Sequence, residues 1–310
     1  MGARVTLVAD GGVAEALAPL VAAWRNEGTV RLVSGPVGRD LLVDLAGDAD
    51  AMLVVGDRRR APRTVLPGPT VAATDGRTVP VGWLPATGLP ALARFATAAA
   101  RVHARREAAP VSAAVLGQRH RRFGELAERT GRALAAVPGV GCRTLTAYDV
   151  HREDLVRTLS LGPAVTVYVG HGRPLGWVGY AGLRARHWGP ALIPQWQPGA
   201  VVLSLTCRTA SRRRTGLSFA ESIPLDGVAA AALGAVGPTL HTANARWAVR
   251  LAHALPHVRT VGELVAAVAP PGDPESVRYR LLGDPTAPLR DAPAWVAADS
   301  HTEVPDVAHR

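Results

Sequence analysis

Two residues of this chain have the type and position that nucleophilic chemistry requires. Cys207 comes shortly after the apolar run Ala200–Leu205, and His171 lies between two glycines after the apolar run Ala164–Val169. A thiolate can attack a carbonyl carbon, and a nearby imidazole can assist its formation and then protonate the leaving amine. Each residue alone is often structural, the cysteine as a small buried side chain and the histidine as part of a turn. The pair, placed alike after two strands, predicts a Cys–His dyad for acyl transfer.

Parallel strands are the elements that must bring these two residues together. Short Val-, Leu- and Ala-rich runs alternate with longer amphipathic segments along the chain. This rhythm predicts an α/β fold with a mostly parallel sheet and helices on both faces. The runs before His171 and Cys207 are almost wholly apolar, which is typical of central strands buried on both faces. Because the carboxyl ends of parallel strands open onto one crevice, neighbouring strands would deliver both residues to the same edge.

The pattern divides the chain into three parts. We expect a smaller N-terminal α/β subdomain over residues 1–108, the principal domain over 109–290 and a loose Pro-rich tail over 291–310. The expected strands are Val5–Ala9, Val30–Ser34, Ala51–Val55, Val79–Leu84, Val111–Leu116, Thr144–Tyr148, Ala164–Val169 and Ala200–Leu205, with Asp226–Val236 and Tyr279–Leu282 as outer strands. The expected helices are Val13–Trp24, Arg39–Leu45, Leu89–Arg105, Phe123–Ala136, Asp154–Leu159, Arg246–Ala254 and Val261–Val268, and a loop is expected at Arg58–Pro69.

The formal net charge of +10 suggests a nucleic-acid partner, but the type of basic residue weakens that interpretation. All 35 basic residues are arginine, which together with abundant Ala, Gly, Pro and Val indicates coding bias from a GC-rich genome. The sequence has no basic runs interleaved with the aromatic residues that stack bases, and no zinc-finger spacing. We therefore expect no nucleic-acid partner.

The cysteine count and the distribution of apolar residues exclude several other classes of protein. Cys142 and Cys207 are the only cysteines, too few for a disulfide framework or a cysteine-based zinc site. The sequence shows no acidic cluster that suggests calcium, so we expect neither a metal nor another cofactor. A run of about 18 apolar residues and a signal-peptide layout are also missing. We therefore expect a cytoplasmic protein with no membrane span; its oligomeric state is left open.

Several short motifs surround the two residues in a fixed order, over residues 70–290. They are Val79–Ala86 before a long helix, Gly170-His171-Gly172 with Trp177 downstream, Phe219-Ala220-Glu221, the small-residue strand Gly227–Thr239 and Leu282-Gly283-Asp284-Pro285. This order resembles the gingipain-type family of cysteine peptidases, in the clan that includes caspases, legumain and separase. One position differs, because Trp83 stands where the family usually has arginine.

The resemblance implies a caspase-like fold and a cysteine endopeptidase that cleaves proteins or peptides through a thioester acyl-enzyme. Cys207 would attack the scissile carbonyl, and His171 would act first as base and then as acid. The backbone amides of Gly172 and Cys207 would form the oxyanion hole. Trp177 and Trp247 would contribute to substrate binding, Trp247 as a wall of the S1 pocket or, alternatively, as a core aromatic on a helix.

The S1 segment departs from the pattern of family members that cleave after Arg or Lys. Those enzymes place an acidic residue after the first strand of this domain, whereas Gly117–Arg122 contains none. Arg121 and Arg122 there predict a preference for an acidic P1 side chain, unless they only cap or solvate the start of a helix. Asp149 and Glu221 are candidates for the carboxylate that orients the histidine, although Glu221 fits a structural role better.

Two other functions compete with a peptidase. One is a catalytically silent caspase-fold scaffold that binds partners through an arginine-rich surface, and the other is a basic nucleic-acid-binding α/β protein. Intact motifs around His171 and Cys207 argue against the scaffold. The missing lysines and stacking aromatics argue against the nucleic-acid-binding protein.

Overall fold

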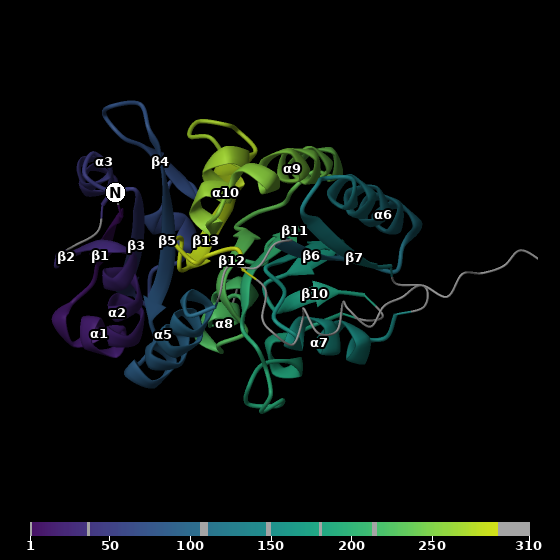
Figure 1. Ribbon diagram of the computed structural model, residues 1–310, viewed down its shortest axis with the longest axis horizontal. Coiled ribbons are helices and arrows are strands. Elements are labelled where there is room, and N and C mark those ends of the chain that lie inside the picture. Colours follow the sequence, from purple (N-terminus) through teal and green to yellow (C-terminus); the bar gives the residue numbers. More distant parts are fainter. Residues whose placement is uncertain are drawn as a thin grey trace, which may run out of the picture.

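One mixed β-sheet runs through the whole protein (Figure 1). The computed structural model describes residues 2–35, 38–105, 111–146, 150–179, 182–212 and 216–290, and eleven strands of these residues form the sheet. They are β1 (Ala3–Val8), β2 (Gly28–Val33), β3 (Ala51–Asp57), β4 (Thr70–Ala72), β5 (Thr78–Ala86), β6 (Val111–Gly117), β7 (Val140–Leu145), β8 (Val165–Val169), β11 (Gly199–Leu205), β12 (Ala229–Ala235) and β13 (Tyr279–Gly283). Two more strands, β9 (His171–Arg173) and β10 (Gly176–Val178), pair as a separate hairpin.

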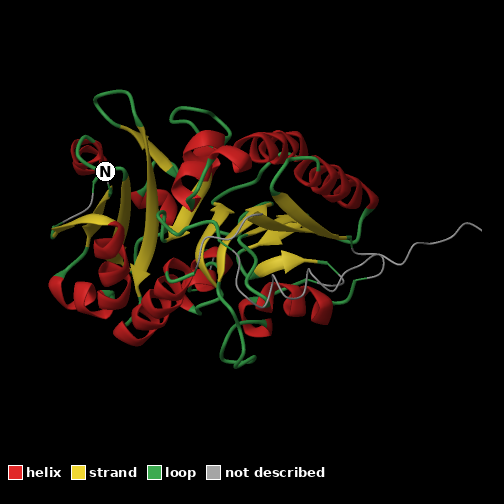
Figure 2. Cartoon of the chain, in the orientation of Figure 1, coloured by secondary structure: helices red, strands yellow, loops and turns green. Residues whose placement is uncertain are grey.

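Helices cover both faces of this sheet (Figure 2). They are α1 (Gly11–Ala16), α2 (Ala18–Glu27), α3 (Arg39–Ala46), α4 (Pro62–Val65), α5 (Leu89–His103), α6 (Arg121–Ala135), α7 (Arg152–Ser160), α8 (Phe219–Leu225), α9 (His241–Ala254) and α10 (Val261–Val268), with 3₁₀ turns η1 (Ala185–His187), η2 (Leu255–His257) and η3 (Ser276–Arg278). Among the described residues, no helix is both long and apolar enough to cross a membrane.

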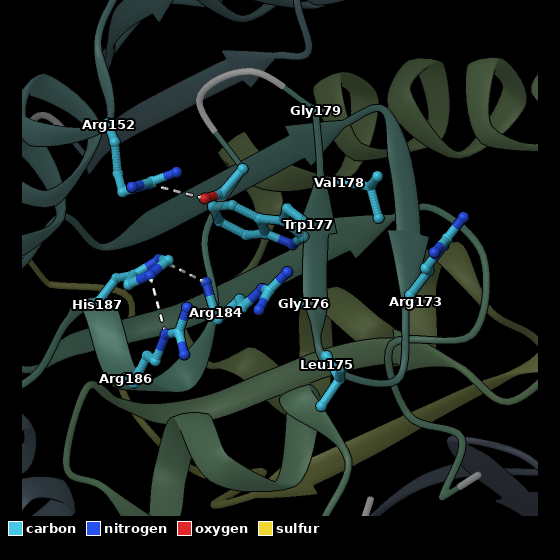
Figure 3. A pocket seen from close by; sticks show the side chains of 11 residues that line it. Arg152, Arg173, Leu175, Gly176, Trp177, Val178, Gly179, Arg184, Arg186 and His187 are labelled. Carbon is cyan, nitrogen blue, oxygen red and sulfur yellow. Dashed lines mark hydrogen bonds between the residues drawn. The ribbon is translucent and has the colours of Figure 1, made fainter.

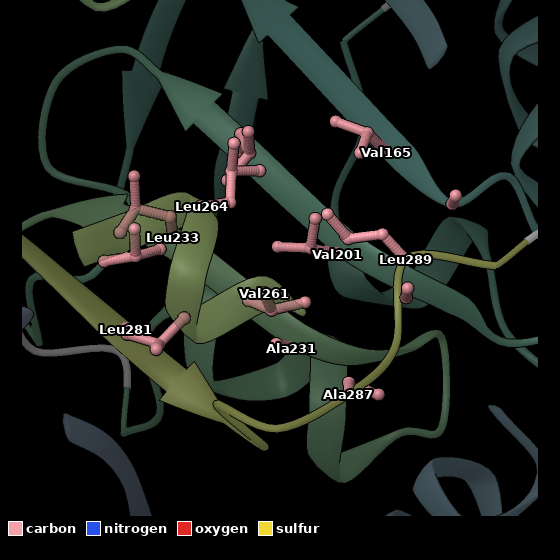
Figure 4. Packing of buried hydrophobic residues seen from close by; sticks show 14 of the residues in the cluster. Val165, Val201, Ala231, Leu233, Val261, Leu264, Leu281, Ala287 and Leu289 are labelled. Carbon is pink, nitrogen blue, oxygen red and sulfur yellow. The ribbon is translucent and has the colours of Figure 1, made fainter. Parts of the chain in front are cut away.

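The hydrophobic core lies in two layers because side chains of a strand alternate between the faces of a sheet. In β3, Leu53 and Val55 belong to one buried cluster, whereas Met52 and Val54 belong to the other. On the first face, Val261 and Leu264 of α10 pack close to apolar side chains of β8, β11, β12 and β13 (Figure 4). Burial on both faces explains why the strands that precede His171 and Cys207 are almost wholly apolar.

The strand order across the sheet is β2-β1-β3-β5-β13-β12-β11-β8-β6-β7, with β4 paired antiparallel to β5. Along this order the neighbours are parallel, except that β13 runs antiparallel to β12. The two halves of the sheet therefore point in opposite directions, and the carboxyl ends of β12, β11, β8, β6 and β7 share one edge. The structure confirms the predicted mostly parallel sheet with helices on both faces.

The prediction that Asp226–Val236 and Tyr279–Leu282 supply outer strands is wrong. Both β12 and β13 lie in the middle of the sheet, and β13 joins the two halves by pairing with β5 through Leu281 and Leu282. All seven residues of β12 are buried, and both α8 and α5 contact this strand of mostly small side chains. Local composition does not specify which strands pair, so the position of these two strands was not predictable from it.

Most predicted elements are present, and their ends differ where a local signal is weak. The helix predicted at Val13–Trp24 is divided at Leu17, because Pro19 begins a second helix. The helix predicted from Arg246 begins at His241, and the expected loop Arg58–Pro69 contains α4. The strand predicted at Thr144–Tyr148 is β7, which ends at Leu145. Residues 147–149, the predicted domain boundary at residue 108 and the predicted tail from 291 lie outside the described residues.

The Leu-Gly-Asp-Pro motif fastens β13 to α5 through a buried ionic cluster. Nε2 of His103 lies 2.8 Å from a carboxylate oxygen of Asp284, and Nδ1 lies 3.0 Å from a carboxylate oxygen of Glu27. Burial disfavours a charged imidazole, but the hydrogen bonds and charges of Asp284 and Glu27 outweigh it and raise the pKa of His103 to about 9. The Leu-Gly-Asp-Pro motif thus has a structural role, because Asp284 helps to join α2, α5 and β13.

Candidate active site

Neighbouring parallel strands bring His171 and Cys207 to one edge of the sheet. β8 pairs with β11 in a register that sets Val169 opposite Leu205, and each functional residue follows its strand by two positions. Both residues line a cavity of about 480 Å³, together with Gly172, Arg173, Val178, Arg208 and Pro238. The expectation that the two residues share an edge is therefore met in the structure.

The backbone at Gly172 approaches that of Cys207 so closely that only glycine fits. A Cβ atom on Gly172 would lie 2.5 Å from the Cys207 carbonyl oxygen and 2.6 Å from the Thr206 hydroxyl oxygen. A side-chain carbon rarely comes closer than about 3.3 Å to an oxygen atom. Any residue larger than glycine would therefore push the two segments apart. The glycine after His171 therefore sets the spacing between the two strand ends.

The Cys207 thiol is held by the turn that follows β12. The backbone N–H of Thr239 donates to Sγ at 3.3 Å, and the thiol is 3.6 Å from the Thr239 carbonyl oxygen. This hydrogen bond fixes the position of the sulfur at the cavity. Arg208 has φ of +58°, the left-handed region, and its N–H donates to the Gly237 carbonyl. This conformation turns the chain sharply after the cysteine and leaves the thiol at the cavity.

The His171 side chain is packed against an aromatic ring, and its backbone is held by hydrogen bonds. The Phe123 ring contacts the imidazole edge to face, with centroids 4.8 Å apart. The His171 N–H donates to Oε1 of Gln118, and the Tyr168 hydroxyl donates to the His171 carbonyl at 3.3 Å. Burial raises the pKa of Tyr168, so this hydroxyl stays protonated and remains a donor. Among the described residues, no side chain makes a hydrogen bond to the imidazole itself.

Trp177 supports the hairpin that begins at His171. Its indole stacks on Tyr168 with centroids 4.2 Å apart, and its N–H donates to the Ser204 hydroxyl at 3.0 Å. Trp177 also pairs with Gly172 across the hairpin, so it links the histidine turn to β11 from beneath. The ring is buried, and its contacts are those of a support for the site.

A comparison with protein families decides where this arrangement belongs. The family model described as peptidase family C25 matches residues 132–290, which make up just over half of the chain and include both His171 and Cys207. The chain belongs to peptidase family C25. It is a cysteine-type peptidase, and the predicted gingipain-type resemblance is confirmed. No curated protein sequence matches the chain.

Solved structures with similar folds agree with this assignment of the C25 peptidase. The Arg-specific cysteine proteinase gingipain R (RgpB) has a TM-score of 0.68 at 16% identity, over 94% of this chain and 79% of its own. The complex of Porphyromonas gingivalis RgpB pro- and mature domains has a TM-score of 0.68 at 15% identity, over 93% of this chain and 80% of its own. The Saccharomyces cerevisiae separase–securin complex has a TM-score of 0.52 at 12% identity, over 76% of this chain and 15% of its own. At these identities the likeness concerns the fold, which is caspase-like as predicted.

The structure does not bring Arg121, Arg122 or Trp247 to the cavity of the C25 peptidase. The Arg121 side chain is 88% exposed and forms an ion pair with Glu125 on the same helix. Arg122 is exposed as well, near His241, whose pKa is lowered by burial and by the charge of this arginine. Trp247 is 1% exposed and packs on Tyr279, which is the core position named as the alternative.

Glu221 of the C25 peptidase has a structural role that leaves no carboxylate oxygen for His171. Nε of Arg212 donates to it at 2.7 Å, and the N–H and hydroxyl of Ser218 each donate at 2.9 Å. Glu221 and Ser218 also form the capping box that begins α8, so the ion pair anchors the loop after Cys207 to a helix. Asp149, the other candidate to orient His171, lies outside the described residues.

Three residues that contact the Cys–His pair were not predicted as site residues. Gln118 follows β6, and Thr239 follows β12, so four neighbouring strands deliver Gln118, His171, Cys207 and Thr239 to one edge. Phe123 comes from the first turn of α6. The first two carry a usable signal, because polar residues directly after predicted parallel strands lie at the crevice. Phe123 carries none, since an aromatic residue on the apolar face of a helix is usually a core residue.

Proposed function

We propose that Cys207 and His171 are the catalytic dyad of this C25 peptidase, and that it cleaves peptide bonds in protein substrates through a thioester acyl-enzyme. The observation that supports this most is the shared cavity at the ends of two paired strands, with both residues at the same distance along the chain from their strands. The contact between Phe123 and His171 and the hydrogen bond from Thr239 to Sγ support it further, because both restrict the reacting groups.

The proposed reaction assigns each group one task. His171 accepts the thiol proton, and the Cys207 sulfur forms a bond to the scissile carbonyl carbon. The backbone N–H groups of Gly172 and Cys207 donate to the resulting oxyanion, a contribution of about 3–4 kcal/mol per donor in related chemistry. The carbon–nitrogen bond then breaks as His171 protonates the amine. Water, deprotonated by His171, attacks the thioester and releases the acid and the free thiol.

An acidic P1 preference is the finer part of the proposal. Arg173 and Arg208 line the cavity that holds the dyad, and no described lining residue carries a carboxylate. Basic walls favour a substrate with negative charge by charge-assisted hydrogen bonding. Arg122 lies close to His241, outside the residues that line this cavity, and Arg121 is neutralised by Glu125.

Covalent labelling of Cys207 tests the dyad. A peptidyl acyloxymethyl ketone with Asp or Glu at P1 should label the wild-type protein once, at Cys207, and His171→Ala should abolish labelling while the fold is retained. Cys142→Ala is the matched control, because Cys142 lies on β7 away from the cavity, and it should be labelled like the wild type. Mass spectrometry identifies the labelled residue.

An unlabelled Cys207 in a folded protein would overturn the proposed dyad and favour the silent scaffold. Equal labelling by reagents with acidic, neutral and basic P1 groups would leave the dyad in place and remove the acidic P1 preference. A preference that persists in Arg122→Ala would show that this arginine is not its source.

A further inference from the structure

A second cavity, rich in arginine, lies beside the β9–β10 hairpin (Figure 3). It encloses about 290 Å³ and is lined by arginines from three separate elements. Arg152 comes from α7, Arg173 from β9, Arg186 from η1 and Arg184 from the residue before η1. Trp177 of β10 also lines the cavity, with its ring buried against Tyr168. The fold thus gathers four positive charges around one small space.

These four arginines differ from several other arginines of the protein in lacking acidic partners among the described residues. Within the part of the chain that the structure describes, none of the four forms an ion pair, whereas Arg212, Arg246 and Arg250 all do. Arg152 donates to the Gly182 carbonyl at 2.9 Å, its one side-chain hydrogen bond among the described residues. Arg152, Arg184 and Arg186 all act on His187, where the charge of Glu153 opposes them, so positive charge predominates around the cavity and attracts anions.

His187 keeps the rim of the cavity in place without cancelling its charge. Its Nδ1 accepts the Arg184 N–H at 3.2 Å, a bond that closes the turn at η1. Burial, followed by the charges of Arg152, Arg186 and Arg184, lowers the pKa of His187. A neutral imidazole remains an acceptor for this N–H, so the arginines are positioned by a group that adds no charge.

The cavity adjoins the catalytic one. Arg173 and Val178 line both cavities, and their side chains lie on the side of β10 opposite Arg152, Arg184 and Arg186 (Figure 3). An extended peptide advances about 3.3 Å per residue. A substrate that leaves the catalytic cavity over Val178 therefore reaches the arginine cavity within a few residues of the scissile bond.

We propose that this cavity is a subsite for an acidic side chain, Asp or Glu, of the protein substrate. The inference rests on the proposed function, because continuity with the Cys–His cavity is what makes a polypeptide the ligand. Guanidinium groups match the two oxygens of a carboxylate. The volume admits one side chain and its hydrogen bonds.

Peptide binding to the inactive Cys207→Ala protein tests the subsite without any need for turnover. Fluorescent peptides from a cleaved substrate, identical except for Glu or Gln at one position near the scissile bond, are compared by anisotropy. At one position the Glu peptide should bind at least about tenfold more tightly, the effect of one charge-assisted hydrogen bond. Adding Arg184→Ala/Arg186→Ala should remove this difference and leave the binding of the Gln peptide unchanged.

Arg157→Ala is the matched control, since Arg157 is exposed on α7, the helix of Arg152, and pairs with Asp154 outside the cavity. It should keep the preference for Glu. Equal affinity for Glu and Gln peptides at every position, or a preference that survives the double variant, would overturn the subsite. Tight binding of phosphopeptides or single-stranded DNA without a Glu preference would overturn it as well.

The outcomes separate this inference from the proposed function. If Cys207 is labelled but no Glu preference is found, the dyad stands and the subsite fails. If Cys207 is not labelled but the Glu preference depends on Arg184 and Arg186, the dyad fails and the cavity stands as a binding site for acidic peptides. Circular dichroism melts of each variant establish that the comparisons are made on folded protein.

Discussion

Replacing Gly172 by alanine tests the close approach on which the proposed site depends. The added Cβ would lie 2.5 Å from the Cys207 carbonyl oxygen, 2.6 Å from the Thr206 hydroxyl oxygen and 2.8 Å from its methyl carbon. Ordinary contacts between carbon and oxygen are about 3.3 Å, so the strand ends must separate by about 0.8 Å. One obstacle is backbone and the other is a buried threonine, so rotating a flexible side chain gives no relief.

This displacement falls on the two segments that carry the reacting groups. A misplacement of about 1 Å lowers an enzymatic rate about 100-fold, and loss of one oxyanion donor lowers it by about 10²–10³-fold. We therefore expect kcat/KM of Gly172→Ala to fall at least about 100-fold. Overpacking of this kind costs about 1–3 kcal/mol of stability, which leaves a folded protein for the measurement.

The assay compares kcat/KM on a cleaved peptide, and the rate of Cys207 alkylation by iodoacetamide, in Gly172→Ala and wild type. The matched control is Gly12→Ala in α1, where an added Cβ meets no atom within 4 Å. It should keep full activity and gain a few tenths of a kcal/mol or more in stability. Activity of Gly172→Ala within about threefold of wild type would refute the reasoning, because the strand ends would then tolerate separation.

Three further predictions concern the groups that support the site and the fold. Tyr168→Phe removes the hydroxyl that donates to His171 and Val178, so urea unfolding should show a loss of about 1 kcal/mol, with kcat reduced more than KM is raised. Unchanged kcat would contradict that role. Glu221→Gln breaks the buried ion pair with Arg212 and should lower the free energy of unfolding by about 3 kcal/mol. Glu125→Gln breaks the exposed ion pair with Arg121 and should lower it by under about 1 kcal/mol. Equal losses would contradict the structural role of Glu221. His103 has a pKa of about 9, above its unfolded value of 6.5, so its stabilisation of about 3 kcal/mol is complete below pH 6.5 and lost as pH rises through 9. Urea unfolding at pH 6, 7.5 and 9 should show this loss in wild type and not in His103→Gln. If the free energies of unfolding of the two proteins differed by the same amount at every pH, the proposed titration of His103 would be disproved.

Local sequence patterns were sufficient to predict the strands that carry the proposed dyad. The almost wholly apolar runs that end before His171 and Cys207 predict strands buried on both faces, and β8 and β11 are buried throughout. The position of each residue after its strand then predicts a common edge, because that rule depends only on parallel pairing. Motif order identified the family for the same reason, since it is a property of the chain itself.

Contacts between distant segments were decided by the tertiary structure alone. The insertion of β13 between β5 and β12, the contact of Phe123 with His171 and the hydrogen bond from Thr239 to Cys207 join residues that no local period relates. The arginine cavity likewise combines α7, β9 and the segment around η1, whose basic residues look individually like solvated surface in the sequence.

His171 and Cys207 as a neighbouring pair were thus determined by the sequence, through strand burial and the geometry of parallel sheets. What surrounds the pair, and with it the charge offered to a substrate, depends on packing. Side-chain position in a packed interior depends on all neighbours together, whereas the sequence alone displays only the neighbours along the chain.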